Sequence, residues 1–287
     1  MEVCDLLPED LRREILPYMT EDVREIRFRA LRECVLTGRE NVFLPKIRMK
    51  AEEMHKLLLH LCDYAVYAHE DQLKDGYLTL RGGHRAGIAG SMVAENDRPI
   101  RFSDIQSITL RVARQIPLFD ETAYLFFRGK TPLSALVVSP PGLGKTTMLR
   151  EIARIAGDKG IQTAIADERG EIAACFRGAP QLDVGKCTDV LDGIPKAKAI
   201  LMLLRACAPQ LIVCDEIGSR EDRFAIEDAA RCGTKVLCSA HGNGIADIMA
   251  RKNLAGLWEG HMFDRIVVLG EEPGRVCAVY NGEGKPC

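Results

Sequence analysis

The sequence predicts an α/β protein in which an open, mostly parallel sheet carries helices on both faces and follows a smaller N-terminal α+β domain. From Pro132 onward, short apolar runs alternate with helical segments, as they do in parallel sheets. Before residue 125, helical stretches mix instead with alternating, glycine-rich ones. The 287 residues are enough for both parts. We therefore expect domains at 1–125 and 126–287, with a connector at about 115–131.

The N-terminal part is predicted from local periodicity. "PEDLRREILPYM" (8–19) and "KAEEMHKLLLHLCDYAVYAHEDQL" (50–73) repeat apolar residues at helical spacing. "VREIRFRALRECVLTG" (23–38) alternates between apolar and polar residues and indicates a pair of strands, and 76–117 is also strand-like. In the connector we expect a short helix between two prolines.

The C-terminal part has five apolar runs that predict strands, and we expect helices between them. The predicted strands are 134–139, 161–167, 209–216, 234–241 and 265–270, and the predicted helices are 146–160, 194–208 and 220–233. Polar residues stand at the ends of four of these strands: Ser139, Asp167, Asp215 and His241. Ligands of open α/β sheets bind at that edge. The last stretch, 263–284, indicates a hairpin that turns at 271–274 and closes the sheet edge.

Composition narrows the classes of function. A net charge of −2 and 6% aromatic residues argue against a protein whose main function is to bind nucleic acid. No apolar run approaches the ~18 residues of a membrane span, and the acidic N-terminus does not resemble a signal peptide. The eleven cysteines include no Cys-x-x-Cys pair, so reduced thiols in a cytosolic protein are expected in preference to zinc ligands or disulfides.

The stretch "SPPGLGKTT" (139–147) lies between a predicted strand and a predicted helix, as a phosphate-binding loop requires. Small residues let backbone N–H groups surround phosphates, and the helix N-terminus adds partial positive charge. Lys145 is expected to reach the β- and γ-phosphates of ATP, Thr146 to hold Mg²⁺, and Thr147 to lie near the α-phosphate. Ser139 stands where the usual motif begins with glycine. The full expected set is Pro140, Pro141, Gly142, Leu143, Gly144, Lys145, Thr146 and Thr147.

Two Asp-Glu pairs are expected near this loop. Asp215 ends an apolar run and is suited to bind Mg²⁺, and Glu216 or Glu168 is the candidate base that polarises the attacking water. Sequence alone leaves the choice between the glutamates open. A solvated pair of acids at the end of a strand, or a capping role for Asp167, is the plainer alternative.

His241 follows the next predicted strand, in "CSAHGNG". At the end of that strand it is placed to sense the γ-phosphate, whereas an isolated histidine is more often structural or merely exposed.

These motifs together resemble the secretion-superfamily ATPases of type II secretion, type IV secretion and type IV pili. The phosphate loop, "DERGE", "CDEIGSRED" and "SAHGN" occur in that family's order, with Glu221 and Asn243 at matching positions. Asp215 departs from many members, which carry glycine there. More narrowly, "LRGGHRAGIAG", "SITLRVARQIP", "SPPGLGKTTMLREIAR" and "ADERGEIAA" make the chain, from about residue 5 to 280, similar to the stage III sporulation AA family.

The resemblance implies a RecA-like P-loop NTPase core that uses ATP and Mg²⁺. It also implies a ring of subunits, expected to be a hexamer, in which arginines of the small domain or a neighbour approach the phosphates. The candidates are Arg81, Arg85, Arg111 and Arg114, whose planar side chains suit phosphate oxygens and whose plainer role is as solvated charges.

The same resemblance implies a motor that energises a secretion-like channel from mother cell to forespore during endospore formation. Such a motor would be cytoplasmic, peripheral at the inner face of the mother-cell membrane, and docked on a small membrane protein of the channel. Two other functions remain open. One is an ATP-binding assembly scaffold without turnover, and the other is a nucleic-acid translocase, although no nucleic-acid partner is expected.

Overall fold

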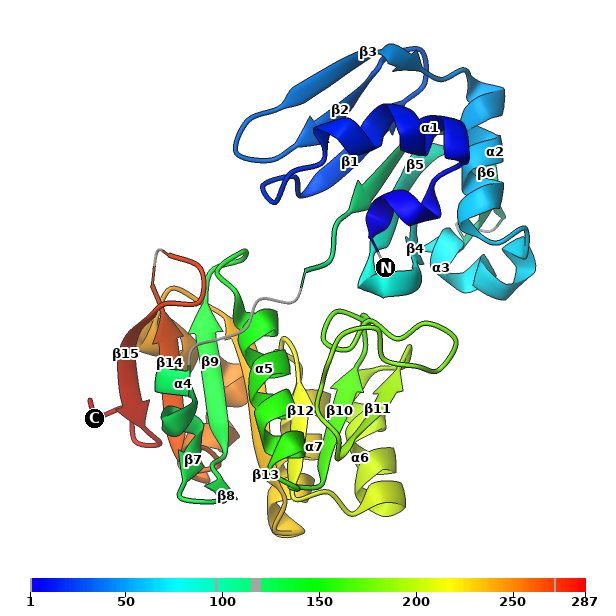
Figure 1. The fold of residues 1–287 in the computed structure, drawn as a ribbon. Helices are drawn as coiled ribbons and strands as arrows, with labels where there is room; N and C mark the ends of the chain where they lie inside the picture. The colour runs from blue at the N-terminus through cyan, green and yellow to red at the C-terminus, as the bar shows by residue number, and fades with distance from the viewer. Residues whose placement is uncertain (1, 96–97, 115–119, 271) are drawn as a thin grey trace. The chain divides into compact units, whose positions relative to one another are not determined.

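The computed structural model describes residues 2–95, 98–114, 120–270 and 272–287. They form two compact units (Figure 1). The first unit contains Met1–Arg114 together with Ala174–Gln181, and the second contains Gln115–Ala173 together with Leu182–Cys287. The predicted connector begins in 115–119, which lie outside the described residues.

The first unit is built on a six-stranded antiparallel sheet in the order β3-β2-β1-β6-β5-β4. Its strands are β1 (Glu25–Arg29), β2 (Glu33–Thr37), β3 (Val42–Arg48), β4 (Tyr77–Thr79), β5 (Arg85–Glu95) and β6 (Arg98–Arg111). Its helices are α1 (Glu9–Ile15), α2 (Ala51–Leu61) and α3 (Glu70–Lys74).

Alternation along the strands and helical periodicity build one core in this unit. In β1, Ile26 and Phe28 point inward while the charged residues between them stay partly exposed, as a sheet with one covered face requires. α2 buries Met54, Leu57 and Leu61, spaced three and four residues apart, and packs on β6. The predicted mixture of helices and strands is therefore present.

The second unit contains a seven-stranded sheet in the order β11-β10-β12-β13-β9-β14-β15, parallel except for the last strand. Its strands are β9 (Ala135–Ser139), β10 (Thr163–Asp167), β11 (Thr188–Asp192), β12 (Leu211–Cys214), β13 (Lys235–His241), β14 (Arg265–Leu269) and β15 (Val276–Asn281). β13 lies between β9 and β12, so strands distant in sequence end side by side at one edge.

Helices cover both faces of this sheet, as predicted (Figure 1). On one face, α5 (Lys145–Asp158) packs against β9, β10 and β13. On the other, alternate strand residues share a core with α6 (Lys196–Cys207), α7 (Arg220–Arg231), α8 (Ile245–Met249) and α9 (Ala255–Glu259). Since side chains alternate along a strand, the residues at positions 139, 167, 215, 239 and 241 belong to the face that α5 covers.

Several elements differ from the prediction or extend it. β11 was missed because "TDVLD" is a polar, half-exposed edge strand without an apolar run. The short helices α8 and α9 were missed as well. The C-terminal hairpin is confirmed: β15 pairs with β14 and forms the sheet edge, although residue 271 of its predicted turn lies outside the described residues. The segment before β9 contains α4 (Asp120–Ala123) and the hairpin β7 (Phe127–Arg128) and β8 (Thr131–Pro132).

Within the described parts of the chain, no helix combines the length and the apolar character needed to cross a bilayer.

Candidate nucleotide-binding site

The phosphate loop (residues 139–147) connects β9 to α5 and presents backbone N–H groups. Gly142 and Gly144 have φ values of 80° and 88°, a left-handed region that glycine adopts without steric cost. Gly144 caps α5, and its cap includes no side-chain hydrogen bond. The first N–H groups of a helix have no partner within the helix, so this end of α5 is suited to an anion.

Ser139 does not impair this geometry. Ser139 is the last residue of β9 and is fully buried. Its φ is not positive, so this position does not need glycine. Its hydroxyl donates to the Pro140 carbonyl at 2.9 Å. The serine therefore occupies the first position of the motif without strain.

Lys145, the first residue of α5, is held inside the loop. Its Nζ donates to the carbonyls of Ser139 and Pro140, each at 2.9 Å, and lies 2.9 Å from His241 Nδ1. Burial lowers the pKa of Lys145, and the carboxylates of Asp215 and Glu216 oppose that shift. The ammonium thus rests on carbonyl oxygens that phosphate oxygens can replace.

Thr146 and Asp215 form the hard-oxygen pair expected for Mg²⁺. The Thr146 hydroxyl donates to Asp215 Oδ2 at 2.5 Å, although the two residues lie on α5 and just after β12. Mg²⁺ prefers oxygen ligands and commonly takes one or two protein ligands together with substrate phosphates. No group of three or more His, Cys, Asp or Glu suited to a metal occurs among the described residues. The pair therefore fits Mg²⁺ that arrives with a nucleotide.

Glu216 lies in a strained turn directly after Asp215. Its φ is 51°, a conformation that costs a residue with a side chain about 1–2 kcal/mol. Its carboxylate forms an ion pair with Arg169 and lies 3.3 Å from His241 Nε2. Strain of this kind persists only where the surroundings fix the residue.

His241 connects the lysine to this glutamate. Nδ1 accepts from Lys145 while Nε2 faces Glu216 Oε1, which fits the neutral tautomer that carries its proton on Nε2. Its place at the end of β13, paired with Ser139 at the end of β9, brings it beside the phosphate loop. The arrangement is one that a phosphate reaching Lys145 would disturb.

Asp167, at the end of β10, does not face the phosphate loop's hydroxyls. It is 2% exposed, and its carboxylate accepts from the backbone N–H groups of Glu171, Ile172 and Ala173. Burial raises the pKa of Asp167, and those backbone bonds oppose the shift. Asp167 is therefore structural, but it is not the helix cap that the sequence suggested, because the described residues between β10 and β11 contain no helix and its carboxylate binds the N–H groups of a loop.

Arg150 of α5 holds the other side of that loop. Its buried guanidinium donates to the carbonyls of Ile172 and Glu171. Glu168 and Arg169, the residues that face the site, are therefore carried on a loop fixed by Asp167 and by the helix that follows the phosphate loop.

Glu168 is engaged by Lys196 of α6, whose Nζ donates to Glu168 Oε2 at 2.5 Å. Burial by itself would lower the pKa of Lys196, but the bond to Glu168 and nearby carboxylates raise it overall. A hollow of about 20 Å³ lies here, lined by both glutamates and Asp215 among others. That volume accommodates about one water molecule.

The C-terminal hairpin also reaches the phosphate loop. The Gly274 N–H donates to the Leu143 carbonyl at 3.0 Å, and a Cβ on Gly144 would approach Gly274 N to 3.1 Å. Gly144 is therefore required both for its positive φ and for this close approach.

The four candidate arginines make contacts within the first unit. Arg81 pairs with Asp63, Arg111 with Glu25, Arg85 stacks on Tyr77, and Arg114 donates to carbonyls of Thr20 and Val23. Their approach to a nucleotide stays a prediction.

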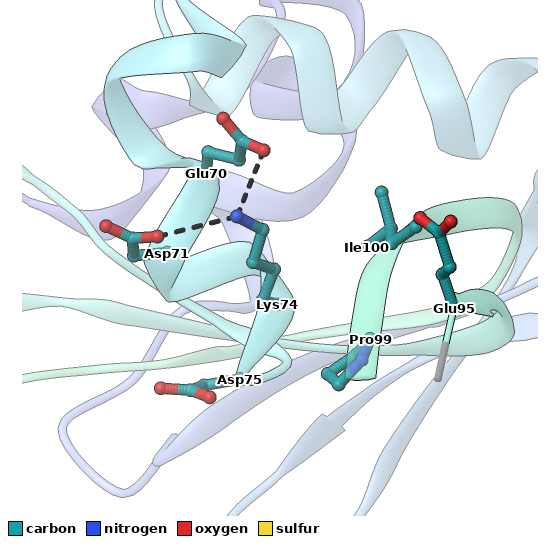
Figure 2. Close-up of a pocket in the computed structure, with 7 residues that line it drawn as sticks. All are labelled: Glu70, Asp71, Lys74, Asp75, Glu95, Pro99 and Ile100. Atoms are coloured by element: carbon teal, nitrogen blue, oxygen red, sulfur yellow. Dashed lines mark ion pairs between the residues drawn. The ribbon is translucent and has the colours of Figure 1, made fainter. Parts of the chain in front are cut away.

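A larger hollow, of about 910 Å³, lies in the first unit (Figure 2). Its carboxylates surround Lys74, which pairs with Glu70 at 3.0 Å and Asp71 at 3.6 Å. No phosphate-loop residue lines it, and an acidic wall repels phosphate. The larger volume of this hollow therefore does not make it the candidate nucleotide site.

Of the other expected residues, Thr147 lies half-buried in the first turn of α5, Glu221 lies exposed in the first turn of α7, and the Asn243 N–H donates to Asp247. Three contributors were not predicted: Arg150, Lys196 and Ser239. A signal existed for Ser239, which precedes His241 by two residues and so shares its face of β13.

The fold of the chain is that of the RecA-like P-loop ATPases. It aligns with the crystal structure of the pilus retraction motor PilT with bound ADP at a TM-score of 0.62, covering 97% of this chain and 82% of that one at 17% identity. The Legionella pneumophila ATPase DotB aligns at 0.61, covering 91% and 76%, also at 17% identity. At such identities the likeness establishes the fold alone.

Sequence comparison assigns the family. The family model described as "Sporulation stage III, protein AA" matches residues 2–286. The stage III sporulation protein AA of Bacillus subtilis (strain 168) is 38% identical over 293 residues, which are 99% of this chain and 95% of that protein. The chain therefore belongs to the sporulation stage III protein AA family.

Proposed function

We propose that this protein is a Mg²⁺-dependent ATPase and that it acts as the motor of a secretion-like channel in endospore formation. One observation carries the enzymatic part. Thr146 Oγ1 and Asp215 Oδ2 meet at 2.5 Å at the start of α5, with Lys145 and Glu216 joined there through His241. A hydrolase of phosphoanhydrides needs these elements together: a loop for phosphates, oxygen ligands for a metal, and a carboxylate for water.

Each residue of the candidate site has its own role in this proposed reaction. Backbone N–H groups of 142–147 bind phosphate oxygens, and Lys145 exchanges two loop carbonyls for them. Thr146 and Asp215 hold Mg²⁺, which when bound neutralises part of the phosphate charge. His241 loses a contact when Lys145 moves, so it registers an occupied site.

We assign the base to Glu216 in preference to Glu168. Glu216 is held at a strained backbone angle beside Asp215, whereas Glu168 is fixed by a lysine whose side chain is 14% exposed. Separating Glu168 from Lys196 would leave two partly buried charges without partners, which is costly. To act as the base, Glu216 has mainly to break its ion pair with Arg169. That costs little, because the Arg169 side chain is largely exposed.

The motor, the ring and the location rest on family and fold. The structural neighbours include a protein named as a retraction motor, and the matching family is one of sporulation. We propose a ring, taken to be a hexamer, docked through a small membrane protein at the inner face of the mother-cell membrane. In this proposal Arg81, Arg85, Arg111 or Arg114 reaches a nucleotide.

The test is ATP hydrolysis per subunit as a function of protein concentration. A specific rate that climbs and then saturates is expected, because neighbouring subunits complete the site. Lys145→Ala should abolish turnover, whereas Lys198→Ala, which removes an exposed lysine of α6, should not. A rate that is flat down to nanomolar protein would contradict assembly from dissociating subunits, while leaving the ATPase intact.

A scaffold that binds ATP without turnover is the second candidate. The observation in its favour is that both glutamates are held in ion pairs, Glu168 by Lys196 and Glu216 by Arg169. ATP binding without hydrolysis at every concentration would establish this candidate for the isolated protein.

A further inference from the structure

Ser239 of β13 is fully buried and forms hydrogen bonds with both acidic residues that follow β12, Asp215 and Glu216. Cys214, the last residue of β12, pairs in register with Cys238 of β13. The residues that follow them, Asp215 and Ser239, therefore face one another. The Ser239 hydroxyl donates to Asp215 Oδ1, which leaves Oδ2 for Thr146. One carboxylate is thereby fixed by a hydroxyl on each oxygen.

The same serine holds the backbone on both sides of the Glu216 Cα atom. The Glu216 N–H donates to Ser239 Oγ at 3.0 Å, and the Ile217 N–H donates to the Ser239 carbonyl at 2.8 Å. Two anchored amides on either side of one residue restrict its φ and ψ. They account for the persistence of the left-handed φ of 51° at Glu216.

We propose that Ser239 is the positioning residue of the hydrolytic site: its hydroxyl orients Asp215 toward the metal position at Thr146, and its hydroxyl and carbonyl oxygens together fix Glu216 in its strained turn. The proposal rests on the proposed ATPase function. It concerns a residue that acts through Asp215 and Glu216, and it explains why a hydroxyl is fully buried beside the apolar residues in the middle of β13.

The experiment compares Ser239→Ala with a matched control, Ser134→Ala. Ser134 is also buried, and its hydroxyl accepts the Val236 N–H at 3.2 Å, at the opposite end of the same sheet. Both variants lose a buried hydroxyl bound to a backbone amide, and similar decreases in melting temperature are expected. Only Ser239→Ala should change the site.

Two readouts are measured on the full chain: the ratio of ATP affinities with and without Mg²⁺, and kcat against KM. Ser239→Ala is expected to reduce the Mg²⁺-linked gain in affinity and kcat by about 10- to 100-fold, the usual effect of losing a residue that orients a metal ligand. KM in saturating Mg²⁺ should change little. Ser239→Thr, which keeps the hydroxyl, should restore both readouts.

A double-mutant cycle shows the route of the effect. If Ser239 acts through Asp215, Ser239→Ala should add little in an Asp215→Asn background. Equal Mg²⁺ linkage and kcat in Ser239→Ala and Ser134→Ala would overturn the proposal, and so would an undiminished effect without Asp215. Should Ser239→Ala fail to fold, Ser239→Thr decides, because a lost Mg²⁺ response in that variant contradicts the assignment.

The affinity measurement also separates this proposal from the ATPase function. Wild-type protein that binds Mg·ATP without turnover would end the claim of hydrolysis but leave Ser239 testable through Mg²⁺ linkage. Wild-type protein that binds no nucleotide would overturn both.

Discussion

Asp167–Glu168 and Asp215–Glu216 lie at the ends of neighbouring parallel strands, β10 and β12, at the same edge of one sheet. After β10 the chain turns back, and the Asp167 carboxylate binds three backbone N–H groups of its own loop. After β12 the chain enters a left-handed turn, and Asp215 binds hydroxyls of α5 and β13. An identical acidic pair thus becomes a structural anchor after one strand and a candidate metal site after the other, according to which donors surround it.

The two aspartates give the largest contrast. Asp215→Asn removes the charge that the metal position needs and should lower kcat about a thousandfold with little change in melting temperature. Asp167→Asn should instead lower the free energy of unfolding by about 2 kcal/mol, since an amide cannot accept all three N–H groups. Steady-state kinetics and thermal unfolding of both variants measure the difference. Equal losses of kcat in the two would break the comparison.

The two glutamates give the next effect. Glu216→Gln should lower kcat about a hundredfold while leaving ATP affinity intact, because the amide cannot accept the proton of the attacking water. Glu168→Gln should lower kcat less than about tenfold, since it loses mainly its bond to Lys196. Single-turnover hydrolysis with separately measured ATP binding distinguishes them. The reverse order of effects would make Glu168 the base.

Arg150 tests the anchored side of the comparison. Arg150→Met leaves two carbonyls of the 168–173 loop without their donor and should cost about 2–3 kcal/mol of stability. Because the loop also carries Glu168 and Arg169, kcat should fall only as far as the loop loosens, by less than about tenfold. Denaturant unfolding gives the stability, and Lys198→Met, which removes an exposed lysine of α6, is the control.

The ion pairs of the glutamates give the smallest effects. Arg169→Ala breaks an exposed pair with Glu216 and should change stability by under about 1 kcal/mol, with kcat within about threefold of wild type. Lys196→Met should be equally mild in kcat but lower the melting temperature slightly more, because its side chain is better buried. A rise of kcat in Arg169→Ala would show that the Glu216–Arg169 pair restrains the base.

Much of the site could be predicted because short, contiguous stretches of the sequence specify it. The phosphate loop needs small residues followed by Lys and Thr at the start of a helix, and "SPPGLGKTT" supplies them in order. Apolar runs fix the strands, and their last residues fix the edge at which Asp215, His241 and the loop meet. The same periodicities predicted two parts, but they gave no sign that Ala174–Gln181 belong to the first unit.

Other features were invisible because they depend on partners distant in the chain. In the sequence, Arg150 and Lys196 look like ordinary cations on helix surfaces, and only the fold places them against the loop of residues 168–173. β11 lacks the apolar run that marks a strand.

The local sequence was enough to predict that a phosphate loop and two acidic pairs lie at one edge of a parallel sheet, because the alternation of apolar runs with helices and the polar residues at strand ends are local patterns. That Asp167 anchors a loop while Asp215 faces Thr146, and that Ser239 is hydrogen-bonded to both Asp215 and Glu216, became visible only in the folded chain. Hydrogen bonds between residues far apart in sequence fix Asp215, whereas those of Asp167 form within its own loop and depend on how that loop folds back.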